Sequence, residues 1–389
     1  MATTHIFIVD TTTFPIHLEY MFSGTGARDE FIDFNNSNLS SLHYQKENNL
    51  VGMIADSQRV RKGDYVIFYL QQNASAGIFE GKFYGIFRVS SNFSFLDNND
   101  GDQYLQCLLG KSLTFRTLIE PYEVYRKGVS EWEALDEIKN LNSPNQMIWS
   151  LIYRKLKGNR GNTMITIYES ERLFKLIREK NNQNALNSIG FGFNKNSQEI
   201  IKNHGKQYTG RQVEINILPR LIYKFRQNLA CETHLQAYIL QNLGRNSNFT
   251  LDNTLLNNEH FEWLGNEVSC GVGMQRIDIA FSIVTESKRI LKALELKAVE
   301  ATPTITFQLQ RYVDWLNQYY VPNRISDIQP VIIAKKIVNK ENQNFMHLCH
   351  SFAQFNNAND CLPISYIEFD VIDGDLIFTR INYLEYSAN

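Results

Sequence analysis

Cysteine is scarce in this chain, and the few cysteines are not clustered. There are five, an odd number, and they stand far apart with no CxxC pair among them. A disulfide framework and a zinc cluster are therefore not expected, and the thiols are expected to be reduced, as in a cytoplasm. The sequence also contains no GxSxG, HExxH or P-loop string. The enzyme classes that those motifs mark are not indicated.

Long apolar runs and a strong net charge are lacking as well. No window holds eighteen apolar residues, so neither a membrane span nor a membrane partner is expected. The opening residues MATTHIFIVD lack the basic start and long apolar stretch of a signal peptide. The net charge is −2 and the pI is about 6.5. The bulk charge therefore gives no sign of nucleic-acid binding, although a local basic patch balanced by acids elsewhere is compatible with it.

What is present indicates a globular protein with two domains. The chain has 389 residues, of which 43% are hydrophobic and 12% aromatic, enough for two separate cores. Residues 1–180 form a β-rich unit in this interpretation, and 211–389 form an α/β unit around a mixed sheet. The segment 181–210 is rich in Asn, Gln and Gly, so it is interpreted as a linker.

The element order within each unit follows from periodicity and turn residues. β-branched and aromatic runs predict strands, and acidic starts with basic ends predict helices. In the first unit we expect strands at 63–71, 77–91 and 102–110, and helices at 129–141 and 169–180. In the second we expect helices at 213–229, 231–244 and 302–320, strands at 273–284, 289–299 and 329–338, and a hairpin at 364–381.

A short run in the last third carries the most chemistry. Asp278 stands in the strand-like MQRIDIAF, and Glu295 and Lys297 stand in ALELKAV. The polar stretch SIVTESKR between them supplies a hairpin turn, so the two carboxylates can converge. Lys297 lies two residues after Glu295 and therefore shares its face. Two carboxylates that hold Mg²⁺ beside an ammonium group suit the cleavage of phosphodiesters.

Neighbouring residues extend this candidate site. Leu296 points its side chain to the opposite, apolar face, and its carbonyl oxygen is a further candidate metal ligand. Glu232, early in the helix at 231–244, is a candidate third carboxylate. Gln308 and Tyr312 are four residues apart and share one helix face, which can point into the same cleft. The plain alternative is a chance D…ExK string on a solvated strand face, and a helix-surface pair for Gln308 and Tyr312. The apolar residues that flank Glu295 and Lys297 argue against a solvated face.

The string RIDIAF…ALELK…QLQRYVDWL resembles the PD-(D/E)XK nuclease superfamily. The Gln-x-x-x-Tyr element is similar to its RecB-like branch, and the whole is most similar to the NucS/EndoMS-like endonuclease domain, over roughly residues 211–385. The resemblance implies a restriction-endonuclease-like fold and a magnesium ion, with Mn²⁺ as a substitute. It also implies metal binding by Asp278 and Glu295, catalytic assistance by Lys297, and a contribution from Glu232. The sequence departs from the pattern at Ile277, where the motif name has proline.

The first unit contains one segment suited to nucleic-acid contact, MIWSLIYRKLKGNRGNT. Cations close together before a Gly-containing turn can hold phosphates. Two aromatic residues four apart can stack on a base, or else form a core-facing pair beside a solvated basic end. The candidate cations are Arg154, Lys155, Lys157 and Arg160, and the candidate stacking residues are Trp149 and Tyr153.

A second resemblance concerns the whole first unit. The turn Lys62-Gly63-Asp64 opens the run KGDYVIFY, and FYGIFRV follows it. This pair is similar to the PUA/EVE-like group of small β-barrels, which implies a barrel-like domain that recognises RNA or modified bases.

The sequence therefore predicts a metal-dependent DNA endonuclease of restriction type, with a reading unit joined to a cutting unit. Double-stranded DNA is the expected partner, and a homodimer is expected because each active site handles one strand. A mismatch- or structure-specific repair nuclease, and a nucleic-acid-binding protein with an inactive nuclease fold, are alternatives. RNA as the substrate stays open.

Overall fold

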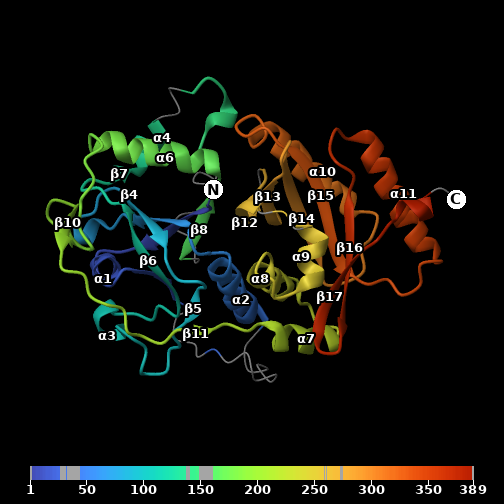
Figure 1. Cartoon of the computed structure of the whole chain (residues 1–389), viewed down its shortest axis with the longest axis horizontal. Helices are drawn as coiled ribbons and strands as arrows, with labels where there is room; N and C mark the ends of the chain where they lie inside the picture. The colour runs from blue at the N-terminus through green and yellow to red at the C-terminus, as the bar shows by residue number, and fades with distance from the viewer. Residues whose placement is uncertain are drawn as a thin grey trace. The chain divides into compact units, whose positions relative to one another are not determined.

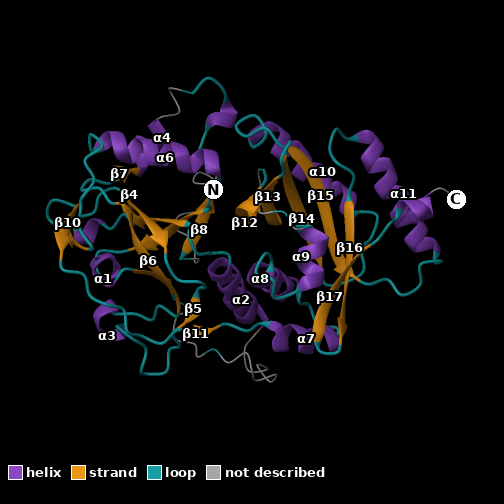
Figure 2. Cartoon of the chain, viewed as in Figure 1, coloured by secondary structure: helices purple, strands orange, loops and turns teal. Residues whose placement is uncertain are grey.

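The chain divides into two compact units, which are described separately. The computed structural model describes residues 2–26, 32, 44–136, 141–148, 161–257, 259, 261–271 and 275–387. Among the described residues, the first unit ends at Asn216 and the second begins at Ile217. Both are mixed α+β structures (Figure 2). In the described part of the chain, no helix has both the length and the apolar character needed to cross a membrane.

The first unit is organised around one large mixed sheet. Its strand order is β11-β5-β6-β4-β3-β1-β8, with β2 added to β6 and β7 added to β4. Figure 1 labels β4, β5, β6, β7, β8 and β11 of this sheet. β1 and β3 are parallel and the other pairs are antiparallel. Over the described residues the order ends at β8 and β11, so the sheet is not a closed barrel. The strands are β1 Thr4–Val9, β2 Phe22–Thr25, β3 Tyr65–Leu70, β4 Lys82–Val89, β5 Phe95–Leu96, β6 Phe115–Glu123, β7 Val129–Ser130, β8 Asn162–Ile165 and β11 Val213–Glu214.

Helices cover this sheet, and two of them were expected. The helix expected at 169–180 is confirmed as α6, Ile167–Lys180, which begins with a capping box between Thr166 and Glu169. The helix expected at 129–141 is confirmed over α4, Glu131–Asp136, whereas Val129–Ser130 form β7. Apolar residues of both sheet faces are buried in separate clusters. The other helices are α1 Thr13–Tyr20, α2 Tyr44–Gln58 and α3 Gln106–Leu109, with the short 3₁₀ turns Ala74–Ala76 and Pro144–Gln146.

A glycine in β4 allows the strand to bend. Gly85 has φ +65°, and a Cβ atom there would lie 2.4 Å from the Phe87 ring. The register of the β3–β4 pair shifts between Val66 and Phe68, beside this glycine. A residue with a side chain would be strained at this positive φ and would collide with Phe87, so the sequence needs glycine here.

Two expectations for the first unit differ from the structure. The strand expected at 102–110 is wrong, because α3 lies there between Leu105 and Gly110, whose φ values of +64° and +66° interrupt an extended chain. The segment 181–210, interpreted as a linker, contains the antiparallel hairpin of β9 Gly190–Asn194 and β10 Glu199–Asn203. Two of its aromatic residues, Phe191 and Phe193, are buried in a core of the unit. Apolar residues at alternate positions therefore outweigh the polar composition around them.

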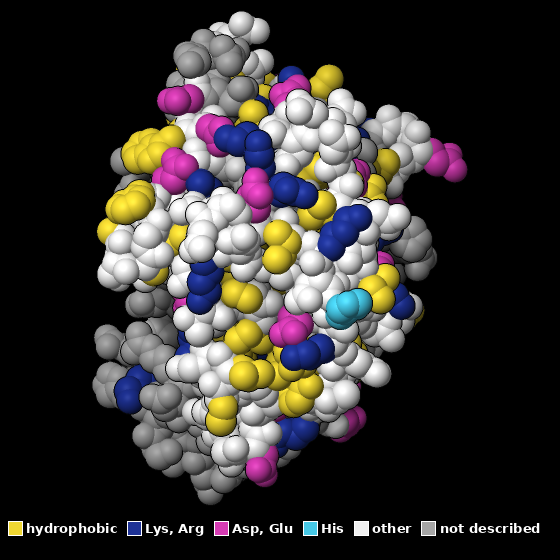
Figure 3. All heavy atoms as spheres, turned by 90° about the vertical axis from the view of Figure 1, so that its left-hand side faces the viewer, with side chains coloured by type: hydrophobic (Ala, Val, Ile, Leu, Met, Phe, Trp, Pro, Cys, Tyr) yellow, Lys and Arg dark blue, Asp and Glu magenta, His cyan; other side chains and the backbone are white. Residues whose placement is uncertain are grey.

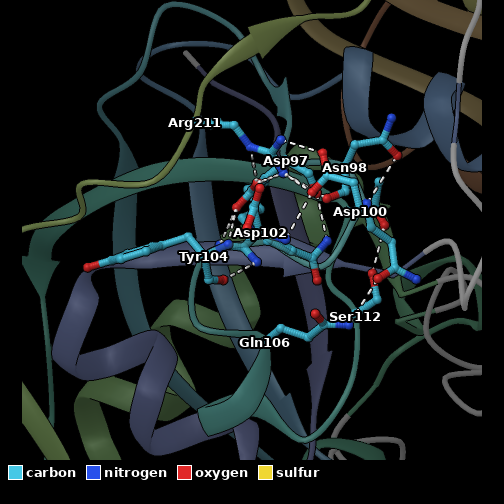
Figure 4. Close-up of polar contacts among 12 residues, drawn as sticks. Asp97, Asn98, Asp100, Asp102, Tyr104, Gln106, Ser112 and Arg211 are labelled. Atoms are coloured by element: carbon cyan, nitrogen blue, oxygen red, sulfur yellow. Dashed lines mark hydrogen bonds and ion pairs between the residues drawn. The ribbon is translucent and has the colours of Figure 1, made fainter.

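Arg211 binds the last segment of this unit to the loop that follows β5. Its guanidinium donates to Asp97 Oδ1 at 3.1 Å, and to Asp100 Oδ2 and Oδ1 at 2.5 and 2.8 Å (Figure 4). It also donates to the Asn98 carbonyl oxygen at 2.9 Å. The chain just before Ile217 is thus held to the loop after β5, not left as a free connection.

The second unit has a six-stranded mixed sheet in the order β12-β13-β14-β15-β16-β17 (Figure 1). The strands β14, β15 and β16 are parallel to each other, and the remaining pairs are antiparallel. The expected hairpin is confirmed, with Asp373 and Gly374 at φ +51° and +83° in its turn. The strands are β12 Phe261–Ser269, β13 Arg276–Val284, β14 Arg289–Lys297, β15 Asp327–Lys335, β16 Ser365–Ile372 and β17 Asp375–Arg380.

Most of the expected helices of this unit are confirmed. The single helix expected at 213–229 instead divides into β11 and α7, which begins at Leu218 with Pro219 in its first turn. Gly244, with φ +70°, follows the end of α8 as expected. The strand β12 was not expected, and it carries a residue that matters for the site. The helices are α7 Leu218–Arg226, α8 Glu232–Asn242, α9 Phe249–Leu255, α10 Ile305–Tyr319, α11 Gln343–Ala358 and α12 Leu384–Ser387.

A buried lysine in this sheet makes the stability of the second unit depend on pH. Lys292 donates to the Leu255 carbonyl oxygen at 2.7 Å, at the end of α9. Burial, and then the charge of Arg380, lower the pKa of Lys292 to about 8 from its ordinary 10.5. Between these two pH values the unfolded chain binds more protons than the folded one, so the free energy of unfolding rises with pH.

We expect this rise to reach roughly 3 kcal/mol and to be absent in Lys292→Met. Urea unfolding across the range from pH 8 to 10.5 measures it. The exposed Lys288, as Lys288→Met, is the control and should keep the rise. An unchanged pH profile in Lys292→Met would contradict the assignment.

Candidate functional site

The candidate site lies where two strands of the second unit separate. Backbone pairing of β13 with β14 stops at Ile279 and Leu294. One residue further on, Asp278 stands opposite Glu295 in the same register. There the Leu296 amide donates to Asp278 Oδ2 at 2.8 Å, so a side chain replaces the backbone partner. Opposite residues of antiparallel strands share a face, so both carboxylates are on one side of the sheet.

Glu295 is the buried centre of the site. Glu295 is 2% exposed. Its two carboxylate oxygens have different hydrogen-bond partners. Oε1 accepts a hydrogen bond from Lys297 Nζ at 2.5 Å, and Oε2 accepts one from the Tyr312 hydroxyl of α10. The Tyr312 hydroxyl also lies 3.0 Å from the Arg276 carbonyl oxygen. The structure thus brings Asp278, Glu295, Lys297 and Tyr312 together, as the sequence predicts.

The charges in this group perturb one another. Burial, and then the negative charge of Glu295, raise the pKa of Asp278 well above its ordinary value, although the Leu296 amide opposes this. Burial acts to lower the pKa of Lys297, but the charges of Glu295, Glu232 and Asp278 outweigh it and raise that pKa. Burial and Glu295 also raise the pKa of the Tyr312 hydroxyl, which stays protonated and donates. Such shifts are frequent at functional sites.

In the described part of the chain, the side chains of the three remaining candidates make no hydrogen bond to the Asp278 or Glu295 carboxylates. Glu232 is the first residue of α8, and its Oε1 lies 3.4 Å from the Ala298 amide, next to Lys297. Gln308 is half-buried on α10, and its side chain makes no hydrogen bond within the described residues, so only Tyr312 of that pair reaches the carboxylates. Leu296 buries its side chain, as expected, and contributes its amide to Asp278.

Sequence reasoning missed three residues next to the site. Gln236 on α8 donates to the Asp278 carbonyl oxygen at 2.7 Å, and Glu267 on β12 pairs with Arg276 at 2.6 Å. A signal for Gln236 was available, because it follows Glu232 by four residues and therefore shares its helix face. Glu267 could not be found, since the strand that carries it was not expected.

The donors of this site fit a magnesium ion. Within the described ranges, no group of three or more His, Cys, Asp or Glu side chains is arranged to hold a metal. Mg²⁺, however, is commonly held by one or two carboxylates together with water and substrate phosphates. Asp278 and Glu295 are two hard oxygen donors on one face. Burial, and then the charge of Glu295, raise the pKa of Asp278, and a bound cation would oppose both effects.

The chain matches no protein-family model and no curated protein. The chemistry of the site is therefore judged from the geometry of its own residues.

The basic segment predicted in the first unit lies outside the described residues. This concerns Trp149, Tyr153, Arg154, Lys155, Lys157 and Arg160. Figure 3 shows one face of the first unit, on which Lys and Arg side chains alternate with Asp and Glu. In this view the charges are mixed, so the face does not present cations alone.

Proposed function

We propose that the chain is a magnesium-dependent DNA endonuclease of restriction type. In this proposal the second unit is a PD-(D/E)XK-like nuclease domain, and the first unit is a PUA/EVE-like reader that selects the site. One observation carries the proposal. Asp278 and Glu295 stand opposite each other where β13 leaves β14, with Lys297 and Tyr312 fixed on Glu295.

Each residue has a role in this proposal. Asp278 and Glu295 would hold the ion, which supplies a polarised phosphoryl oxygen and an acidified water when bound. Lys297 stays protonated, because neighbouring carboxylates raise its pKa, and offers its N–H groups to a water or a phosphate oxygen. Tyr312 holds Oε2 of Glu295, which leaves Oε1 to face Lys297. Glu232 adds negative charge beside Lys297.

The reader role of the first unit is supported by its β3–β4 pair. The turn at Gly63 leads into β3, which pairs antiparallel with β4, as the resemblance implies. A modified base is one candidate for what this unit selects. Cleavage of both strands of a duplex would need two copies of the second unit, so a homodimer belongs to the proposal.

Lys297→Ala is expected to lower the rate of DNA cleavage on the order of 10²–10³-fold, because it removes a charge that stabilises the transition state. The measurement is cleavage of two matched plasmids with Mg²⁺, one unmodified and one with modified cytosines. Lys340→Ala is the matched control, because Lys340 also pairs with a buried strand glutamate, Glu368, at 2.7 Å.

Discrete fragments from wild type and the control, but not from Lys297→Ala, would support the nuclease. The plasmid that is cut would show whether a modification is read or avoided. If wild type cuts neither plasmid, the restriction proposal is wrong, and mismatched or branched DNA, RNA, and binding alone are tested next.

A further inference from the structure

A half-exposed arginine stands beside the two carboxylates. Arg276 is the first residue of β13 and precedes Asp278 by two positions, so both belong to the same face of the strand. The Arg276 side chain is 36% exposed, whereas Glu295 is almost fully buried. An anion that approaches the carboxylates from solvent can therefore meet this guanidinium.

Arg276 forms an ion pair with Glu267, a carboxylate on β12 that stands opposite Asp278. Glu267 stands opposite Asp278, because the pairs Asn266–Ile279 and Val268–Ile277 flank it. Arg276 Nη1 donates to Glu267 Oε2 at 2.6 Å, a diagonal pair across β12 and β13. The Glu267 side chain is 21% exposed, so the pair is partly solvated and exchangeable.

Glu267 is also connected to Asp278 through a helix. The Gln236 side-chain amide lies 3.4 Å from Glu267 Oε1 and 2.7 Å from the Asp278 carbonyl oxygen. The charge of Glu267 adds to the burial and the Glu295 charge that raise the pKa of Asp278. Glu267, Asp278 and Glu295 thus form one row across three strands.

A row of three carboxylates repels a phosphodiester, so cations are needed along the path of the substrate. Lys297 supplies one cation at the Glu295 end of the row, and Arg276 supplies another at the Glu267 end. The planar guanidinium matches the oxygens of a phosphate, which can replace the carboxylate in the same geometry.

We propose that Arg276 binds a backbone phosphate of the DNA beside the scissile one, and that Glu267 is its counter-ion in the absence of DNA. This inference rests on the proposed nuclease function. DNA binding exchanges Glu267 for a phosphate on Arg276. Arg276 is thus a substrate-binding residue, and Glu267 acts through it.

The test measures the dissociation constant of duplex DNA at several salt concentrations, in the Lys297→Ala background so that the DNA is not cut. Adding Arg276→Ala should weaken DNA binding by about ten-fold. It should also lower the slope of log affinity against log salt concentration by about one, as expected for the loss of one phosphate contact. Adding Glu267→Gln should instead tighten binding by a few-fold, because Arg276 loses its competitor. When Arg276 is already replaced by alanine, adding Glu267→Gln should no longer tighten DNA binding.

The controls come from a similar pair at the other end of the β13–β14 hairpin. Lys288 and Asp327 lie 3.0 Å apart, and each side chain is 47% exposed. Lys288→Ala and Asp327→Asn should leave binding and the salt slope unchanged. Arg276→Lys, which keeps the charge, should restore part of the affinity lost in Arg276→Ala.

Two results would overturn the inference. If Arg276→Ala and Glu267→Gln weaken binding alike, or if Arg276→Ala binds as tightly as its parent, the pair is only structural. Unfolding in urea identifies a variant that fails to fold. If Arg276→Ala fails to fold, the DNA affinity of Arg276→Lys decides whether the inference holds. If the parent binds no DNA and wild type cuts none, the proposed function fails together with this inference. Cleavage by wild type with no effect of Arg276→Ala refutes the inference alone.

Discussion

Glu295→Gln is expected to abolish DNA cleavage and, in the same protein, to make the metal-free chain less sensitive to pH. Glutamine keeps the shape of the side chain, but its single amide oxygen can accept a hydrogen bond from only one of the two donors, Tyr312 and Lys297. It removes the negative charge that a magnesium ion needs and that raises the pKa of Asp278. We expect a loss of cleavage on the order of 10²-fold or more, because one of the two proposed metal ligands loses its charge.

The pH effect has a definite sign. The folded-state pKa of Asp278 is raised above its unfolded value, so the folded chain binds more protons between the two pKa values. The free energy of unfolding of the metal-free protein therefore falls as pH rises through that window. In Glu295→Gln the pKa of Asp278 is lower, so the fall is smaller. Added Mg²⁺ should offset the fall in wild type, because it binds the ionised carboxylates.

The matched control is Glu368→Gln. Glu368 is also a buried strand glutamate, and it accepts from a lysine, Lys340, and from a tyrosine, Tyr366. Its replacement should leave cleavage and the effect of Mg²⁺ intact. Equal loss of cleavage in both variants would show that the second unit needs any such buried carboxylate for folding, and would refute the special role of Glu295.

Asp97→Asn is expected to destabilise the first unit by about 3–5 kcal/mol, because it leaves a buried arginine without its counter-ion. Arg116 and Asp97 are 3.0 Å apart, and both side chains are fully buried. The Arg116 guanidinium also donates to the carbonyl oxygens of Leu113 and Tyr104, at 2.7 and 2.6 Å, and to the Tyr208 hydroxyl at 2.9 Å. These partners accept three of its five N–H groups but do not neutralise its charge.

Asp100→Asn is the control for this prediction. Asp100 is the exposed partner of Arg211, in the loop that also holds Asp97 (Figure 4). An exposed pair contributes at most about 1 kcal/mol, so this variant should change stability little. Urea unfolding, followed by a signal from the first unit, measures both variants. The prediction would be contradicted if Asp97→Asn lowered the free energy of unfolding no more than Asp100→Asn does.

The strands that hold the candidate site could be predicted from their apolar runs and the turn between them. RIDIAF contains the β-branched Ile277 and Ile279, ALELK has apolar residues around Glu295, and a polar turn separates the two runs. The helix that carries Tyr312 has a regular apolar period and begins after Pro303. Local spacing alone therefore placed Asp278, Glu295 and Lys297 on neighbouring strands.

Elements whose local pattern conflicts with their surroundings were predicted less well. The hairpin β9–β10 is embedded in polar residues, and only the burial of Phe191 and Phe193 against the rest of the unit identifies it. The strand β12 became recognisable only through its pairing with β13. The first unit was expected to be barrel-like, but its sheet is open, because β8 and β11 do not pair in the part of the chain that is described.

The sequence by itself determined the strands, the helix and the residue types of the candidate site, because these depend on periodicity and spacing along the chain. The tertiary structure decided which of those residues meet. It brought Tyr312 but not Gln308 to Glu295, and it added Gln236, Glu267 and Arg276. The physical reason is that strand register and helix packing bring together residues far apart in sequence, and a local pattern does not contain the register.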